Sequence, residues 1–167
     1  VDALIDANDA LFTVDLTHGQ LEQIFYQTTA LRQFDLQMTL PCSYDDYCAQ
    51  RRHFVTPETL ENYRIVDTAS KLLERFHSGF KHVTVEYREQ TSCGEPVWLQ
   101  KTVLMAQDTV FDAASGREMP VIHGIILFRD TSIFHAQEQA ENQRLQEAFE
   151  EADSASKAKT AFMNRMS

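Results

Sequence analysis

The sequence is poor in the residues that break helices and in those that cross-link chains. Its 167 residues include five Gly, four Pro and three Cys. None of the glycines forms either of the common phosphate-binding loops, and no Gly-x-Ser-x-Gly elbow occurs. We therefore predict that the chain is not itself an enzyme.

Long apolar runs and positive charge are also scarce. No run approaches the roughly 20 apolar residues of a membrane span. The net charge of -10 disfavours a broad phosphate-binding surface, so we predict no nucleic-acid partner. The hydrophobic content of 43% is that of a globular domain. The chain starts without Met or a signal peptide, so we expect a cytoplasmic piece of a longer protein; an upstream membrane anchor in that parent stays open.

Metal-ligand patterns are missing as well. The cysteines Cys42, Cys48 and Cys93 match no zinc spacing, and their odd number suits a reducing compartment. The six His residues form no His-x-x-x-His pair. We predict no metal site.

The C-terminal part of the sequence contains neither helix breaker. The last Gly is Gly124 and the last Pro is Pro120. Beyond Thr131 the composition turns to strong helix formers, and residues 130–132 offer N-cap side chains. This predicts one long helix over residues 132–167.

The apolar positions of this helix recur at alternating steps of three and four residues. Such spacing is typical of the seam of a parallel two-stranded coiled coil, so we expect a homodimer. The alternative is a solvated connector helix with a chance heptad. The predicted seam comprises Leu145, Ala148, Ala152, Ala155, Lys159, Phe162 and Met166.

Residues 1–130 mix strand and helix patterns. Thr56-Pro57 starts one amphipathic helix, which Gly79 ends. The order predicts an α+β domain with a five-stranded antiparallel sheet and helices on one face. The last strand is apolar on both faces, as in a strand buried from both sides. The predicted strands cover residues 10–15, 21–26, 81–88, 97–106 and 121–128, with a loop over 112–120.

Aromatic residues recur on the segments that would face one another. They either line a small-molecule cavity between sheet and helices or fill it. Arg51-Arg52-His53 is then either a carboxylate-binding group at the cavity mouth or a solvated basic patch. The candidate lining is Tyr44, Tyr47, Phe54, Tyr63, Phe76, Tyr87 and Trp98.

Short motifs in the first 132 residues resemble those of PAS domains. The PAS run E-Y-R, then D-G, then W resembles a stretch of this sequence: Val85-Glu86-Tyr87-Arg88, then Gly94, then Val97-Trp98. Cys93 stands in the place of the Asp. Arg129-Asp130-Thr131-Ser132 resembles the D-I-T element after the last PAS strand, with Thr131 for Ile. The H-P-D-D stretch is not recognisable. The resemblance implies a PAS sensory domain over residues 1–130.

The C-terminal run resembles the start of the dimerisation helix of bacterial sensor histidine kinases. Residues 155–167 are similar to the run A-K-S-x-F-L-A-x-M-S, which in that family precedes the phosphoacceptor His. The resemblance implies that residues 131–167 are a signalling helix and the start of this dimerisation helix. The parent would be a two-component kinase of hybrid type, truncated here before that His, with a response regulator or receiver domain as partner.

The resemblance also raises the question of cofactors. Flavin-binding members carry N-C-R-F-L-Q, and neither Cys42 nor Cys48 lies in such a run. Haem would need an axial ligand, for which His77 is the candidate. The simpler interpretation of His77 is a side chain that the helix dipole favours at a helix C-terminus. We predict no cofactor.

The predicted role is mechanical. Asp130 and Thr131 join the last strand to the long helix, so a change in the sheet would pass through them to the kinase. Two alternatives stay open. One is a cone-shaped small-molecule-binding protein or enzyme of the ketosteroid-isomerase type, which starts with helices and lacks a polar C-terminal rod. The other is a PAS sensor with a different output, such as a cyclase.

Overall fold

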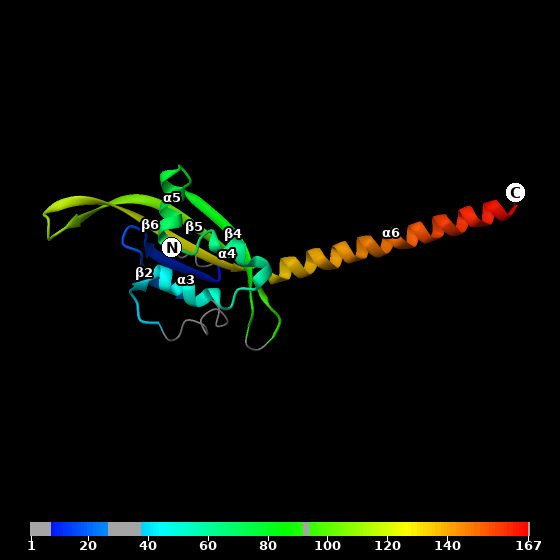
Figure 1. Ribbon diagram of the computed structural model, residues 1–167, viewed down its shortest axis with the longest axis horizontal. Coiled ribbons are helices and arrows are strands. Elements are labelled where there is room, and N and C mark those ends of the chain that lie inside the picture. Colours follow the sequence, from blue (N-terminus) through cyan, green and yellow to red (C-terminus); the bar gives the residue numbers. More distant parts are fainter. Residues whose placement is uncertain (1–7, 27–37, 92–93, 167) are drawn as a thin grey trace. The chain divides into compact units, whose positions relative to one another are not determined.

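The computed structural model describes residues 8–26, 38–91 and 94–166 (Figure 1). The chain divides into two compact units, residues 1–131 and residues 132–167. The second unit is a single helix, α6 (Ser132–Met166), which confirms the predicted long helix. Among the residues described, no helix combines the length and the apolar character needed to cross a membrane.

The first unit is built on one antiparallel sheet with the order β3-β2-β1-β6-β5-β4. The N-terminal hairpin lies beside the last strand, since Ala10 pairs with Tyr26 on one side and with Phe128 on the other. The strands are β1 (Ala10–Asp15), β2 (Gln20–Tyr26), β3 (Cys42–Ser43), β4 (His82–Glu89), β5 (Val97–Asp112) and β6 (Arg117–Asp130).

The predicted five strands are therefore one too few. The additional strand, β3, has two residues and pairs with Gln20 and Leu21 of β2. Two residues carry no alternating pattern, so nothing in the sequence marks them as a strand.

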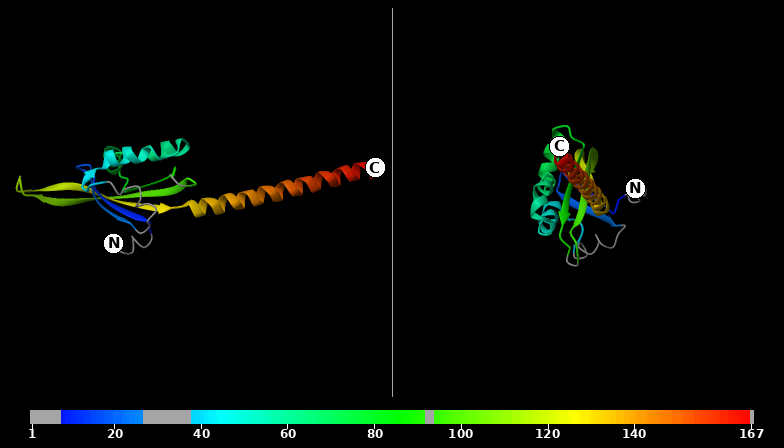
Figure 2. Two further views of the ribbon diagram at one scale, coloured as in Figure 1. Left: turned by 90° about the horizontal axis from the view of Figure 1, so that it is seen from below. Right: turned by 90° about the vertical axis from the view of Figure 1, so that its right-hand side faces the viewer.

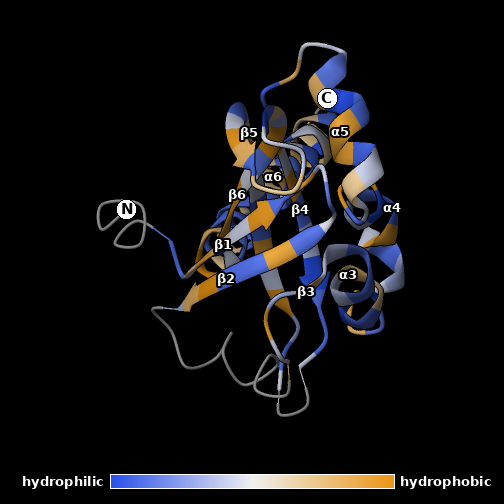
Figure 3. Cartoon of the chain, turned by 90° about the vertical axis from the view of Figure 1, so that its left-hand side faces the viewer, coloured by the Kyte–Doolittle hydropathy of each residue, from blue (hydrophilic) through white to orange (hydrophobic). Residues whose placement is uncertain are grey.

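Short helices cover one face of the sheet, as predicted (Figure 2). Hydrophobic and hydrophilic residues are interspersed along them (Figure 3). The three α-helices bury apolar side chains in the core, among them Tyr47, Tyr63 and Leu72. The helices are α3 (Tyr44–Arg52), the 3₁₀ turn η1 (Pro57–Thr59), α4 (Leu60–Arg64) and α5 (Ala69–His77).

The prediction of one helix from Pro57 to Gly79 is wrong, because the chain leaves the helix between α4 and α5. There the Thr68 hydroxyl accepts the Lys71 N–H as the N-cap of α5. The Val66 carbonyl accepts the Tyr44 hydroxyl at 2.6 Å instead of a helical N–H. The predicted end holds, since Gly79 has a positive φ of 97° just beyond α5.

The predicted loop over residues 112–120 is mostly strand. β5 and β6 pair as far as Asp112 and Arg117, and the turn lies between them. Hydrogen bonds from the Ser115 side chain and the Ala114 and Ser115 amides to the Asp112 carboxylate lower the pKa of that carboxyl. This exposed ribbon has no buried face, so its sequence lacks the alternation that identifies a strand.

The core lies between the sheet and the helices. Phe12, Ile126 and Val103 are aligned across β1, β6 and β5 on the inner face and are buried. Leu127, on the outer face of β6, is only 8% exposed. His123 and Ile125, on the same outer face, are only half-buried, so the expectation that the last strand is buried from both sides is met in part.

Thr68→Ala tests the helix break. Loss of the N-cap hydroxyl should lower the free energy of unfolding by about 1 kcal/mol, because the Lys71 amide loses its acceptor. Urea unfolding followed by the fluorescence of the single Trp, Trp98, reports on the first unit. Thr68→Ser is the matched control and should keep most of the stability. Equal losses in both variants would contradict the capping role.

Candidate functional site

A buried lysine lies among the core aromatic residues. Lys101 points from β5 to the helix side of the sheet and is 1% exposed. The hydroxyl-bearing rings of Tyr44 (α3) and Tyr63 (α4) and the ring of Phe128 (β6) surround its amine. The distances from Nζ to the three ring centroids are 5.0, 5.7 and 5.6 Å. Such distances are those of cation–π contacts.

Sequence reasoning missed Lys101, although a signal existed. Within β5 it has the same parity as Leu99, Val103 and Met105, which form the apolar side of the strand. A lysine on the core-facing side of an alternating strand is unusual and marks a candidate site.

Hydrogen bonds fix the groups around this amine. Lys101 Nζ donates to the Tyr44 hydroxyl at 2.8 Å, and that hydroxyl donates in turn to the Val66 carbonyl. The Tyr63 hydroxyl donates to the Cys48 carbonyl at 2.7 Å. The Cys48 sulfur lies 3.8 Å from Lys101 Nζ. Strand β5 is thereby connected to α3 and α4 through polar groups inside the core.

The charge of Lys101 has no ion-pair partner among the described residues. Burial lowers the pKa of the Lys101 amine, while Cys48, Asp67 and Glu89 act in the opposite direction. Burial likewise raises the pKa of the Tyr44 and Tyr63 hydroxyls above their ordinary value of 10.0. The two tyrosines therefore stay neutral donors, and the amine is held closer to its neutral, nucleophilic form.

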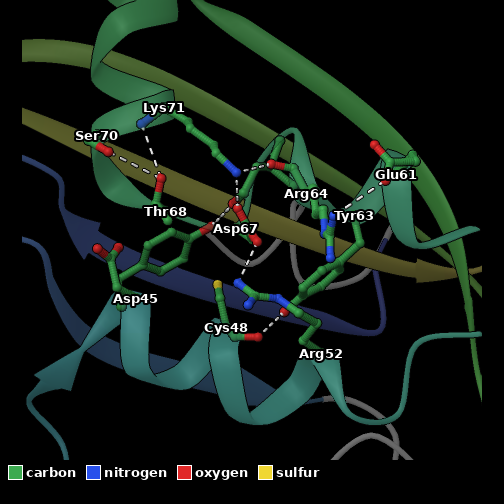
Figure 4. A network of polar contacts seen from close by, with 12 residues as sticks. Asp45, Cys48, Arg52, Glu61, Tyr63, Arg64, Asp67, Thr68, Ser70 and Lys71 are labelled. Atoms are coloured by element: carbon green, nitrogen blue, oxygen red, sulfur yellow. Dashed lines mark hydrogen bonds and ion pairs between the residues drawn. The ribbon is translucent and has the colours of Figure 1, made fainter. Parts of the chain in front are cut away.

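Ion pairs border the cluster. Arg51 Nη2 contacts Glu89 Oε2 at 2.5 Å, and the two side chains are 8% and 3% exposed. Arg52 and Lys71 each contact the buried Asp67 carboxylate at 2.6 Å (Figure 4). The interpretation of residues 51–53 as a solvated basic patch is therefore wrong for Arg51, because the buried Glu89 carboxylate neutralises its charge.

Of the other predicted aromatic residues, Tyr87 alone joins this cluster among those that the structure describes. Tyr87 packs edge-on against Tyr63 and belongs to it, whereas Tyr47 packs against Phe12. Phe54 is 41% exposed beside Arg51. Trp98 is on the opposite face of β5 from Lys101, with Arg88 over its ring.

The end of α5 lies outside the cluster around Lys101. Phe76 is half-buried and contacts the ring of His77, the last residue of α5, which is exposed. An open depression of about 510 Å³ lies between α4 and the end of α5. Its lining is mainly charged and includes Arg64, Lys71 and Arg75. It contains none of the predicted aromatic side chains.

Two observations concern the residues considered for metals and cofactors, while the absence of both stays a prediction. Within residues 8–26, 38–91 and 94–166, no three His, Cys, Asp or Glu side chains gather as metal ligands. Cys48, rejected as a flavin site from its sequence context, is fully buried beside Lys101.

Asp130 and Thr131, the predicted joint between the last strand and the long helix, are hydrogen-bonded to other parts of the first unit. Thr131 is buried; its N–H donates to the Trp98 carbonyl at 2.9 Å and its hydroxyl to Glu86 Oε2 at 3.0 Å. The exposed Asp130 donates its N–H to the Asp9 carboxylate at 2.6 Å. The residue after β6 is thus bonded to both β4 and β5.

The predicted seam residues lie on α6, where no residue is buried in the single chain. Several large apolar side chains on this helix are more than half exposed. They are Ile133, Phe134, Leu145, Phe149, Phe162, Met163 and Met166.

Comparisons with known proteins find several solved structures that resemble this chain, including the following two. No protein-family model and no curated protein matches the chain. One neighbour is the N-terminal domain of a diguanylate cyclase with a PAS/PAC sensor from Marinobacter aquaeolei. It is 20% identical, with a TM-score of 0.41, and the match covers 75% of this chain and 97% of that one. The other is an RNA-binding light-oxygen-voltage receptor, 15% identical, with a TM-score of 0.41 over 83% of this chain and 32% of that one.

The buried amine should give the stability a specific pH dependence. Because burial lowers the pKa of folded Lys101 below its ordinary value of 10.5, the unfolded chain binds more protons between the two values. Wild-type stability should therefore rise, relative to Lys101→Met, as the pH increases toward the ordinary lysine value of 10.5. The raised tyrosine pKa values act in the opposite sense but are common to both proteins.

Urea unfolding at a series of pH values measures this difference. Lys81→Met is the matched control, because Lys81 is exposed and keeps its water on folding. If the difference in the free energy of unfolding between wild type and Lys101→Met does not vary with pH, the prediction is wrong.

Proposed function

We propose that this chain is the PAS-type sensory and dimerisation module of a two-component sensor histidine kinase. One observation carries the proposal. β6, the strand between β1 and β5, is followed after Thr131 alone by the 35-residue helix α6, and Thr131 is buried and bonded to the neighbouring strands. The element order, with β1 of the N-terminal hairpin beside the last strand and helices on one face, supports the PAS interpretation over the ketosteroid-isomerase type.

The proposed mechanism runs from the sheet to the helix. A signal that alters packing between the helices and the sheet would act on β4 and β5, which hold Thr131 through Glu86 and the Trp98 carbonyl. A small-molecule ligand can shift such an equilibrium only by its differential affinity for the two states. In this proposal the chain carries no catalysis and needs no cofactor.

The proposed partner of α6 is a second copy of α6. A helix of this length without a buried residue gains nothing from tertiary packing, which is the main source of helix stability in proteins. Pairing at the seam would cover Leu145, Phe162 and Met166, which are 57, 61 and 74% exposed in the single chain. Lys159 falls within the seam, where one polar residue fixes the register at a cost in stability.

The C-terminal run favours a kinase over a cyclase as the output. Residues 155–167 resemble the start of the kinase dimerisation helix, and the parent would then act on a response regulator or receiver domain. The parent gene tests this directly: His followed by Glu after Ser167 supports the kinase, and any other continuation removes it.

A pair of Ala→Asp substitutions tests the seam. Ala155→Asp places two carboxylates face to face in the proposed dimer and should yield monomers in sedimentation equilibrium. Ala161→Asp is the matched control, because this position lies outside the heptad seam of the same helix, and it should leave the dimer intact. A monomeric wild-type chain, or equal behaviour of the two variants, would refute the seam.

A second pair tests the joint in the parent kinase. Asp130→Ala should leave the domain folded, because the side chain is exposed, yet abolish the signal-dependent change in autophosphorylation. Arg129→Ala is the control: its side chain also is exposed, on the opposite side of β6, and its response should stay normal. Retention of the response in Asp130→Ala would remove Asp130 from the proposed relay.

A further inference from the structure

The thiol of Cys48 and the amine of Lys101 face each other inside the core. Cys48 is fully buried on α3, Lys101 is fully buried on β5, and Sγ and Nζ are 3.8 Å apart. The hydrogen bond to the Tyr44 hydroxyl holds Nζ in this place. We propose that Cys48 and Lys101 are a peroxide-sensitive pair, in which oxidation joins Sγ to Nζ by a covalent sulfur–nitrogen bond.

The first step is oxidation of the sulfur. An amine beside a thiol can hold the thiol's proton, which leaves the thiolate that reacts with peroxides. The Cys48 thiolate attacks one oxygen of hydrogen peroxide and the O–O bond breaks. The departing hydroxide takes the proton from the Lys101 ammonium and becomes water. The products are a sulfenic acid and a neutral amine.

The second step closes the bridge. Sulfenic acids condense with nearby nitrogen nucleophiles. The Lys101 lone pair attacks Sγ, the S–O bond breaks, and hydroxide leaves with one proton of the amine as a second water. One peroxide is consumed, two waters form, and the sulfur loses two electrons. A thiol reductant restores the thiol and the amine and is itself oxidised to a disulfide.

Two features of the site favour this reaction over others. No carboxylate pairs with Lys101 among the described residues, so burial favours the neutral amine that the second step needs. The rings of Tyr44, Tyr63 and Phe128 pack around the amine. A reagent little larger than water suits so filled a core, whereas a bulky electrophile does not.

The bridge would tie the helix layer to the sheet. Cys48 belongs to α3, and Lys101 pairs with Phe128 of β6, two residues before that strand ends. The inference does not depend on the proposed kinase output or on dimerisation, and its test involves neither.

The experiment uses the full chain with Cys42→Ser and Cys93→Ser, so that Cys48 is its one thiol. The folded protein is treated with hydrogen peroxide, digested and analysed by mass spectrometry. We expect the Cys48 and Lys101 peptides to be linked, with a mass two hydrogen atoms below their sum, and to separate after treatment with a thiol reductant. Peptide analysis is needed because methionine oxidation also adds oxygen to the intact chain.

Two controls make the result specific. Treatment in guanidinium chloride should give no linked peptide, because the pair is brought together by the fold. In Lys101→Met, Cys48 should gain oxygen atoms and form no link. Circular dichroism first shows that the protein with Cys42→Ser and Cys93→Ser is folded as the wild-type chain is. If Cys48 of that folded protein gains only oxygen, or keeps a thiol that still reacts with maleimide after unfolding, the proposal is overturned.

Discussion

β6 holds the first unit together, because both of its edges are hydrogen-bonded to other strands and its inner face is buried under the helices. On one side it pairs with β1 and on the other with β5, so it joins the N-terminal hairpin to the rest of the sheet. Its inner residues, such as Ile126, face the helices, while Leu127 is covered on the other side. The chain then passes through Thr131 into α6. Disturbing this strand would disturb the sheet, the core and the helix start together.

The layer between sheet and helices contains more charge than a small core usually holds. Asp67 and Glu89 are buried carboxylates, each with a cation beside it. Lys101 differs, because aromatic faces, a hydroxyl and a thiol replace the carboxylate. Buried ion pairs add little net stability, and an unpaired buried charge lowers it. The Lys101 cluster is therefore a place where stability has been given up, which is common at functional sites and rare in purely structural cores.

The sequence predicts the parts of this fold that have a clear period. β1 and the start of α6 lie where expected, because alternation and the absence of Gly and Pro are local signals. The break before Thr68 and strand β3 depend on contacts with distant residues, which no local pattern records. Of the predicted aromatic residues, Tyr63 packs against Tyr87 and shares the Lys101 amine with Tyr44, whereas Phe54 is exposed and Trp98 is on the other face of β5. Their role as the lining of a ligand pocket stays a prediction. Lys101 escaped notice because a lysine is assumed to be exposed.

The pairing of β1 with β6 has a consequence for how the protein is made. Ala10 and Phe128 are neighbours in the sheet, although they are far apart in the sequence of the first unit. During synthesis the N-terminal hairpin emerges first and must wait, with a strand edge open, until β6 has been translated. Closing so distant a contact is slow, which leaves the nascent first unit exposed to aggregation until β6 has been made. Deletions from either end of this unit should therefore remove a central strand and not a dispensable flank.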